Sequence, residues 1–447
     1  MHSRREILKR LSAGFGYLAF AGIANAQAEK EAPLAPKPSH FPGTAKRVIF
    51  LCMSGGPSHV DTFDYKPQLI KDHGKSGHYG SKLLSSPWKF RQRGESGLWV
   101  SDLFRNVGEH ADDLCLIHSM QCDQPAHPSA VTQMHTGTAR FIRPSLAAWT
   151  LYGLGTENDS VPGFISMNPM SGNSRNYGSA FLPSIFAGTK VEAGRGNKES
   201  VRDISNDMLS RKQQRAQLDL MQTLNRKKLK RDKFQPQVEG VIEAYELAFR
   251  MQGAMPDVMD TSKETAATRS MYGVDQEETS TFGTQCLLAR RMVESGVRFV
   301  EVTQGSWDQH TNLKYEHEAK AKACDKPIAG LLQDLKQRDM LKDTLVIWGG
   351  EFGRSPEGQG SAGDGRNHNN KGYTTWMAGG GVKGGFSYGA TDEYGYETIE
   401  NKCHIHDWHA TILHLLGLDH ERLTYRYAGR DFRLTDVHGV VAKDILA

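Results

Sequence analysis

The sequence lacks any pair of cysteines at the CxxC spacing that structural zinc sites use. Its six cysteines are scattered along 447 residues, so a small zinc-stabilised module is not expected. Cys52 and Cys115 lie in apolar, strand-like runs and are expected to be small buried side chains rather than disulfide partners. An oxidising compartment would permit a disulfide, but the sequence identifies no pair.

Strong charge imbalance is also missing. The formal net charge is +4, and without residues 1–26, which hold four basic residues and one acidic residue, it falls to +1. A nearly neutral chain has no global basic field with which to bind nucleic acid. The apolar fraction of 38% supports a packed core rather than disorder. We therefore expect a globular protein that does not bind nucleic acid.

The first residues resemble an export signal. Arg4 and Arg5 begin a twin-arginine sequence, residues 11–23 form a weakly apolar segment, and Ala24-Asn25-Ala26 is a candidate cleavage site. The apolar segment is too short and too glycine-rich to span a bilayer comfortably. We predict that residues 1–26 are a removed twin-arginine signal peptide. The mature protein would then be periplasmic or secreted, with no integral membrane span.

Short apolar runs alternate with segments of helical periodicity along the rest of the chain. This alternation predicts an α/β fold with a central, mostly parallel sheet and helices on both faces. After a linker at 27–46, we expect a single domain over 47–447 with a charged helical insertion at about 198–252. The runs that predict strands are at residues 48–53, 114–117, 297–302, 344–348 and 373–378.

The run at 344–348 is the most informative of these strands. It is β-rich, too short for a helix, and stops at two glycines followed by Glu351. In α/β sheets, ligands bind in the crevice beyond the carboxyl ends of the strands. The glycine-rich stretch 349–370 is either a surface loop or the lip of an active site, and its position directly after a strand favours the lip.

Candidate metal ligands follow several of these strands. Carboxylate and imidazole groups suit zinc, manganese or iron, and a bound ion of this kind can activate water for hydrolysis. One alternative stays open: Glu351 could instead form a buried ion pair with Arg354 or Arg366. The candidates that follow separate strands, or precede the late helix at 410–416, are Asp61, His127, Asp308, His310, Glu351, His368 and His406.

Long segments of the chain resemble one family. They include FLCMSGGPSHVDTFDYKP at 50–67, TLVIWGGEFGRSP at 344–356 and HDWHATILHLLGLDHERLTYRYAGRDFRLTDVHG at 406–439. These segments resemble the twin-arginine-exported, sulfatase-like family known as domain of unknown function 1501, which is similar to the alkaline phosphatase and sulfatase superfamily. The resemblance implies an alkaline phosphatase/sulfatase-like fold with one or two divalent metals at the strand ends.

The resemblance also implies roles for individual positions. Glu351 falls at the carboxylate of the superfamily's Asp-His metal pair, and Phe352 falls where the histidine would be, so His368 is a candidate replacement. His127 falls at the nucleophile, and a histidine cannot be converted to formylglycine. Asp61 would have to replace the paired aspartates that a sulfatase carries after its first strand.

The sequence therefore predicts an exported metal-dependent hydrolase of a phosphate or sulfate ester with a non-standard nucleophile. Its partner would be an anionic small molecule or a sulfated or phosphorylated glycan. An arginine side chain suits such a ligand because its planar guanidinium can donate two parallel hydrogen bonds to a tetrahedral oxyanion. The alternative is a catalytically inactive sulfatase-like protein that binds an anionic glycan or a protein partner. The expected roles are a divalent metal (zinc, manganese or calcium) on Asp61, Asp308, His310, Glu351 and His406, catalysis by His127 and His368, and anion binding by Arg354 and Arg366.

Overall fold

The computed structural model describes residues 33–170, 174–194, 200–201, 208–232 and 236–447. The predicted signal peptide and the first part of the predicted linker lie outside these residues. Within them, no helix combines the length and the apolar character needed to cross a membrane.

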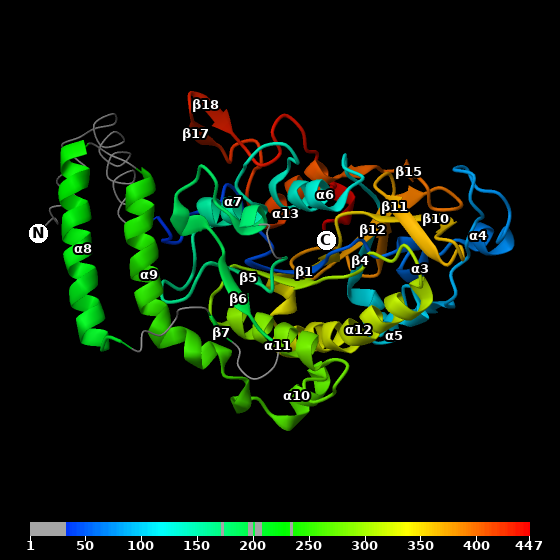
Figure 1. Ribbon diagram of the computed structural model, residues 1–447, viewed down its shortest axis with the longest axis horizontal. Helices are drawn as coiled ribbons and strands as arrows, with labels where there is room; N and C mark the ends of the chain where they lie inside the picture. The colour runs from blue at the N-terminus through cyan, green and yellow to red at the C-terminus, as the bar shows by residue number, and fades with distance from the viewer. Residues whose placement is uncertain (1–32, 171–173, 195–199, 202–207, 233–235) are drawn as a thin grey trace, which may run out of the picture.

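A ten-stranded mixed sheet forms the centre of the molecule (Figure 1). The most central strand, β1 (Arg47–Met53), pairs in parallel with β8 (Phe299–Gln304) on one side and with β9 (Thr344–Gly349) on the other. In spatial order the strands are β13 (Phe386–Tyr388), β4 (Leu114–Gln121), β12 (Tyr373–Ala378), β9 (Thr344–Gly349), β1 (Arg47–Met53), β8 (Phe299–Gln304), β5 (Phe164–Met167), β6 (Thr189–Glu192) and β7 (Ser200–Val201), with β16 (Cys403–His404) also paired to β4.

The central strands are apolar on both faces because both faces are covered. Residues 48–53 of β1 are all buried, and so is the whole of β9, as expected for parallel strands between two helical layers. The mostly parallel α/β sheet predicted from the sequence is confirmed. Three antiparallel pairings, of β12 with β4, of β12 with β9 and of β6 with β7, make the sheet mixed.

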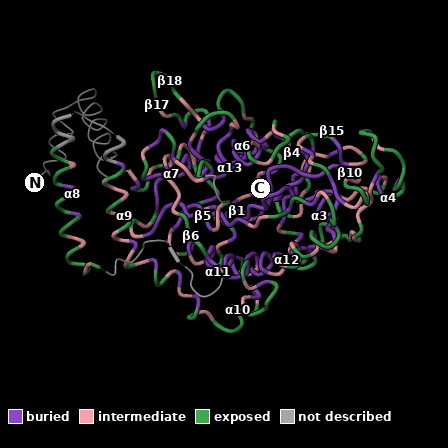
Figure 2. Tube along the Cα trace, in the orientation of Figure 1, coloured by how far each residue is buried: buried purple, intermediate pink, exposed green. Residues whose placement is uncertain are grey.

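Helices cover the two faces of the sheet as separate layers (Figure 1). Burial is concentrated in the sheet and in the helix faces turned towards it (Figure 2). One layer contains α6 (His127–Thr136), α7 (Leu146–Leu154) and α13 (Ile405–Leu415), and the other contains α5 (Arg105–Gly108), α10 (Ala266–Tyr272), α11 (Ser280–Glu294) and α12 (Leu313–Gln337). The short helices α3 (His59–Thr62) and α4 (Pro67–Lys71) follow β1.

The charged segment contains two long helices, α8 (Arg211–Asp232) and α9 (Pro236–Met259), which lie together at one end of the molecule (Figure 1). Arg215 on α8 donates two hydrogen bonds to Glu246 on α9, at 2.7 and 2.8 Å. The helix α9 also turns Leu247 and Met255 into the main core. The charged stretch is therefore attached to the body of the protein through α9.

The glycine-rich stretch after β9, expected to be a surface loop or the lip of an active site, folds as a two-stranded hairpin, β10 (Gly353–Gln359) with β11 (Gly365–Asn369). Gly365 explains why a glycine is needed here, since a Cβ atom on it would lie 2.0 Å from the backbone of His310. Further hairpins are β2 (Phe90–Arg93) with β3 (Leu98–Ser101), β14 (Ala390–Thr391) with β15 (Thr398–Glu400), and β17 (Tyr425–Tyr427) with β18 (Arg430–Phe432). All six cysteines are buried and unpaired.

Candidate metal centre

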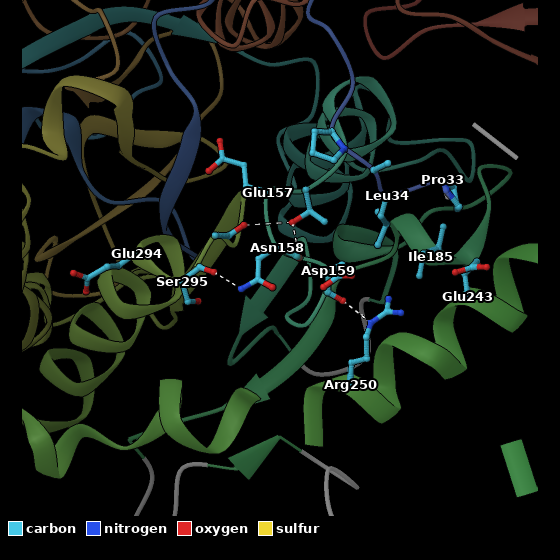
Figure 3. A pocket seen from close by; sticks show the side chains of 14 residues that line it. Pro33, Leu34, Glu157, Asn158, Asp159, Ile185, Glu243, Arg250, Glu294 and Ser295 are labelled. Carbon is cyan, nitrogen blue, oxygen red and sulfur yellow. Dashed lines mark hydrogen bonds between the residues drawn. The ribbon is translucent and has the colours of Figure 1, made fainter. Parts of the chain in front are cut away.

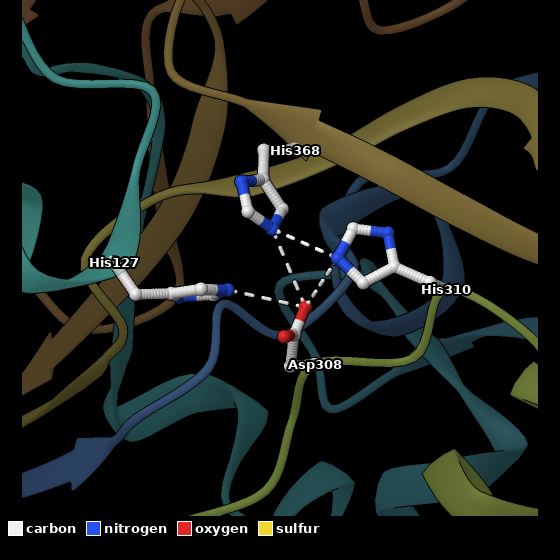
Figure 4. A group of neighbouring side chains, drawn as sticks. All are labelled: His127, Asp308, His310 and His368. Atoms are coloured by element: carbon white, nitrogen blue, oxygen red, sulfur yellow. Dashed lines mark hydrogen bonds and ion pairs between the residues drawn. The ribbon is translucent and has the colours of Figure 1, made fainter.

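Four of the predicted site residues meet beyond the carboxyl ends of the central strands (Figure 4). One oxygen of Asp308, Oδ1, lies 3.1 Å from Nε2 of His127, 2.9 Å from Nε2 of His310 and 3.3 Å from Nε2 of His368. The ligand atoms of all four residues lie within 4.8 Å of one another. These are the side chains of one compact site.

Three separate elements deliver these side chains. Asp308 and His310 come from the segment that follows β8, His127 is the first residue of α6, and His368 is on β11. The strand β11 lies directly against the backbone of His310 at Gly365. The hairpin therefore brings His368 to a position that a free loop would not define.

Each of the three imidazoles uses its Nδ1 atom in a contact outside the cluster. Nδ1 of His127 lies 2.7 Å from Glu351 Oε1, and Nδ1 of His310 lies 2.6 Å from Gln359 Oε1. Nδ1 of His368 lies 2.7 Å from a backbone carbonyl oxygen, that of Pro125. Because all three partners are acceptors, each Nδ1 carries the proton. The neutral rings then present a lone pair at Nε2.

These Nε2 lone pairs point at one another and at a carboxylate. Nε2 of His310 and Nε2 of His368 are 3.1 Å apart, which brings two acceptors together. Nε2 of His127 is buried and, within the residues that the structure describes, has no hydrogen-bond partner. A cation between these atoms would satisfy all of them, and histidine ligands that donate their other ring nitrogen to an acceptor are typical of metal sites. The residues present therefore fit a divalent metal.

Arg354 holds the carboxylate of this cluster in place. Its side chain is fully buried and donates a 2.6 Å hydrogen bond to Asp308 Oδ1. Partial burial favours the neutral acid, but the hydrogen bond and the charge of Arg354, followed by the charge of His127, hold the pKa of Asp308 well below its usual range. Asp308 is therefore ionised at neutral pH and available as a ligand.

The imidazoles of His127 and His368 differ in their electrostatic surroundings. Burial lowers the pKa of His127, but the hydrogen bond and charge of Glu351 outweigh it and raise that pKa above the usual value. Burial dominates at His368 and lowers its pKa despite the hydrogen bond to Pro125. The carboxylates of Glu351 and Asp308 thus both favour the protonated form of His127.

Glu351 occupies a position behind the cluster rather than within it. Its side chain is fully buried, and Oε1 accepts hydrogen bonds from His127 Nδ1 and from the backbone N–H of Gly55, the latter at 3.0 Å. Its oxygens therefore orient His127. The structure thus gives Glu351 a different role from the metal ligand expected from the sequence. It also pairs with neither arginine that the sequence offered.

Asp61 and Arg366 also differ from their expected roles. Both are fully buried, and they form a two-pronged ion pair at 2.7 and 3.1 Å. Arg366 donates in addition to the carbonyl oxygens of Ser355 and Leu84. Neither residue belongs to the histidine cluster, since their charges are paired with each other inside the protein. Asp61 is accordingly not placed as a metal ligand, nor Arg366 as an anion-binding residue.

Arg354, the second expected anion-binding residue, is equally committed. Besides Asp308 it donates to the backbone carbonyl oxygens of Gly55, Gly56 and Trp307. With its donors used inside the protein, Arg354 orients the loops that form the cluster. It is not placed to receive a substrate anion.

His406 lies outside the cluster, in a neighbouring cavity of about 310 Å³. Its Nδ1 atom is buried without a hydrogen-bond partner. Burial, with the neighbouring His404 and His438, lowers its pKa to about 4. The cavity also contains Asp123 and Gln124, which directly precede the Pro125 that fixes His368. His406 thus belongs to a space beside the cluster and is not one of its ligands.

One contributor, Gln359, was not recognised in the sequence, and it orients His310. Phe352, which the sequence placed where a ligating histidine would be, is buried with its ring centroid 4.8 Å from that of His127 and 4.6 Å from that of His368. Phe352 thus packs against two of the imidazoles. The sequence did not show that Arg354 pairs with His368 across the hairpin, and this pairing is what brings residues 352–359 beside the cluster.

A larger cavity of about 770 Å³ lies elsewhere, at the junction of residues 33–36 with α9 and the end of α11 (Figure 3). Its polar groups bond to one another: Arg250 donates to the carbonyl oxygen of Asp159, and Asn158 donates to that of Ser295. Neither group of metal-ligand side chains in the described chain includes a residue that lines it. We therefore place the candidate site at the histidine cluster.

The model of one protein family matches almost the whole of the sequence that forms the sheet and its helices. It is described as "Protein of unknown function (DUF1501)" and matches residues 45–446. The chain belongs to this family. A search of curated proteins found no match to this member of DUF1501.

Several solved structures are similar to this DUF1501 protein at low identity. The PsFucS1 sulfatase from Pseudoalteromonas sp. is 15% identical over 91% of this chain and 72% of its own, with a TM-score of 0.35. The lipoteichoic acid synthase LtaP from Listeria monocytogenes is 8% identical over 92% and 80%, with a TM-score of 0.37. The C-terminal periplasmic domain of EcEptC from Escherichia coli, in complex with Zn, is 8% identical over 87% and 88%, with a TM-score of 0.36. At this level of likeness, activity, metal and substrate do not carry over.

Proposed function

We propose that the mature protein is an exported, metal-dependent hydrolase of a phosphate or sulfate ester. The observation that carries this proposal is the convergence of three Nε2 atoms on Asp308 Oδ1 while each Nδ1 is held by an acceptor. Three imidazoles and one carboxylate suit zinc or manganese. Calcium prefers an all-oxygen set, so the nitrogen-rich cluster favours zinc or manganese over calcium.

The cluster is open enough for substrate to reach it. The side chains of Asp308 and His310 keep 40% and 37% of their surface exposed. A divalent ion bound here would polarise an ester oxygen and lower the pKa of a bound water. The positive charges of the divalent ion and of Arg354 exceed the negative charges of the Asp308 and Glu351 carboxylates, so the loaded site has a net positive formal charge. That charge favours an anionic ester over a neutral one.

The nucleophile in this proposal is water. Both ring nitrogens of His127 are engaged, Nδ1 by Glu351 and Nε2 by the cluster, so His127 is better suited to hold the ion than to attack the substrate. His368 is engaged in the same way, by Pro125 and by the cluster. The proposal therefore assigns His127, His368, Asp308 and His310 as ligands and makes Glu351 a positioning residue for His127.

The test begins with metal content. The mature protein, purified without chelator, is analysed for bound metal beside Asp308→Asn and His310→Ala, with His78→Ala as a control because His78 is exposed and lies outside the cluster. We expect both cluster variants to lose metal from this site and the control to keep it. Full retention in both cluster variants would overturn the assignment.

Turnover is measured next on a panel of phosphate and sulfate esters with added zinc or manganese. We expect metal-dependent hydrolysis that His310→Ala abolishes and His78→Ala preserves. The second candidate, an inactive binder of an anionic glycan, is favoured by one observation: Phe352 stands where a metal-ligating histidine was expected, and its buried ring packs against His127 and His368. Saturable glycan binding without turnover on any ester or metal would support that candidate instead.

A further inference from the structure

A second group of metal-ligand side chains lies inside the core, apart from the cluster described above. It consists of Cys52, His135 and Glu301, all buried, and their ligand atoms lie within 4.8 Å of one another. Cys52 is on β1, Glu301 is on the neighbouring strand β8, and His135 is in the last turn of α6. None of them is used by the proposed hydrolase site.

The strand register explains why these side chains meet. Phe50 is paired with Glu301 in the parallel ladder between β1 and β8, and side chains two residues apart on a strand share a face. Cys52 and Glu301 therefore point to the same side of the sheet. His135 approaches them there, with its ring 6.0 Å from that of Phe50.

The contact between His135 and Glu301 is not that of an ordinary hydrogen bond. Nδ1 of His135 lies 2.7 Å from the carbonyl oxygen of Val131, so the proton of the neutral ring is on Nδ1. The buried Nε2 has no hydrogen-bond partner among the described residues and lies 3.3 Å from Glu301 Oε2. A charge-assisted hydrogen bond would be about 2.7–2.9 Å. Ligand atoms on a tetrahedral ion with bonds of about 2.0–2.1 Å are separated by roughly 3.3 Å.

The surroundings add a further unsatisfied group. Ser166 on β5 is paired in register with Glu301, and its buried hydroxyl has no hydrogen-bond partner in the described part of the chain. A buried hydroxyl without a partner is costly. In addition, one thiolate and one carboxylate together neutralise a divalent ion, which makes burial of the charged group acceptable in the core.

We propose that Cys52, His135 and Glu301 bind a structural zinc ion that fastens α6 to the sheet. His127 and His135 lie at opposite ends of α6, and eight helical residues correspond to an axial rise of about 12 Å. The two ions of a two-metal catalytic site are about 3.5–4 Å apart. The buried ion is therefore a separate one, which fixes the helix whose first residue reaches the hydrolase site.

The competing explanation of this group is that a proton on His135, and not a metal ion, balances the charge of Glu301. Burial lowers the pKa of His135, but the charge of Glu301 and the contact with it outweigh burial and raise that pKa. His135 would then be an imidazolium paired with a buried carboxylate, and Cys52 would stay a thiol, since burial raises its pKa well above the usual value. The two explanations differ in whether sulfur is bound to metal.

Cobalt substitution separates them, because the cluster at Asp308 contains no sulfur. Mature protein stripped with a chelator is reloaded with Co²⁺ and its near-ultraviolet spectrum is recorded. A thiolate-to-cobalt charge-transfer band is expected, together with bound cobalt in excess of what the Asp308 cluster holds. Cys52→Ser is expected to remove the band and one ion per chain, whereas Cys115→Ser, at another buried cysteine, keeps both.

Asp308→Asn provides the reverse control, since it disables the hydrolase site and is expected to leave the band intact. Circular dichroism checks that each variant is folded, and Glu301→Gln, which keeps the thiol, is expected to weaken cobalt binding at least tenfold. Absence of the band in the wild-type protein, or its persistence in Cys52→Ser, would overturn the zinc proposal. Neither result bears on whether Asp308 holds a metal.

Discussion

At the scale of single residues, Asp308 connects every part of the candidate site. One of its oxygens receives Arg354 and faces three imidazoles. A carboxylate whose pKa is held well below its usual range, and which lies in an accessible cluster, marks a candidate functional site. Asp61, by contrast, is fully buried and forms an ion pair with Arg366.

This contrast predicts that Asp61→Asn damages stability and leaves metal binding unchanged. Removing one partner of a buried ion pair strands the other charge, which costs about 3–5 kcal/mol. Urea unfolding of the wild-type and variant proteins measures the loss, and metal analysis checks that the Asp308 cluster is still loaded. Loss of metal with unchanged stability would return Asp61 to the list of ligands.

The same pair has a pH signature. Burial alone would raise the pKa of Asp61, but the charge of Arg366 and its hydrogen bonds lower it below 3.8. The ion pair therefore stabilises the fold fully above about pH 4 and loses its contribution as the pH falls through the depressed value. The stability difference between the proteins should shrink in acid. Glu397→Gln, at the exposed pair with Lys371, should cost less than about 1 kcal/mol at any pH.

The identities of the cluster residues could be predicted from the sequence, but several roles could not. His127, Asp308, His310 and His368 follow recognisable strand ends or loops. The commitment of Arg366 to Asp61, or of Glu351 to His127, depends on which side chains become buried together. Sequence position alone does not reveal such partners.

At the scale of elements, the hairpin β10–β11 does most to complete the site. It supplies His368, Gln359 and Arg354, and its approach to the segment after β8 depends on Gly365. Repeated glycines suggested a loop because they weaken strand propensity. They in fact permit two backbones to pack closely.

We predict that Gly365→Ala weakens metal binding by roughly ten- to a hundredfold, since an added Cβ against the backbone of His310 forces a shift, and such overpacking costs about 1–3 kcal/mol. Competition with a metal-sensitive chelator measures the affinity. Gly305→Ala is the matched control, because it precedes the same segment and a Cβ there meets nothing within 4 Å. Equal affinities in both variants would contradict this role of the hairpin.

The central strands could be predicted because their apolar runs are continuous. The predicted limits of β12 agree with the structure, and β8 starts two residues later than its predicted run. The short strands β5, β6 and β13, which lie towards the two ends of the sheet, were missed, since their pairing depends on neighbours far away in the sequence. Long-range pairing of this kind leaves little local pattern.

At the scale of the whole molecule, bound metal should contribute to global stability. A ligand that binds only the native state stabilises it by about 2.7 kcal/mol at a concentration one hundred times its Kd. We therefore predict that a chelator lowers the melting temperature of the wild-type protein and that added zinc restores it. Differential scanning calorimetry provides the measurement.

The matched comparison is Asp308→Asn, for which the chelator should cause a smaller decrease. An identical decrease in both proteins would mean that the stabilising metal lies somewhere other than the Asp308 cluster.

The four cluster residues are spread from position 127 to position 368, across most of the sheet's chain order. During synthesis, His127 emerges long before His368 does. A nascent or truncated chain that lacks the β10–β11 hairpin thus has an incomplete ligand set, and high-affinity loading must wait until the hairpin has packed against the segment after β8. Acquisition of the ion would then mark a chain in which α6, the segment after β8 and the hairpin have come together.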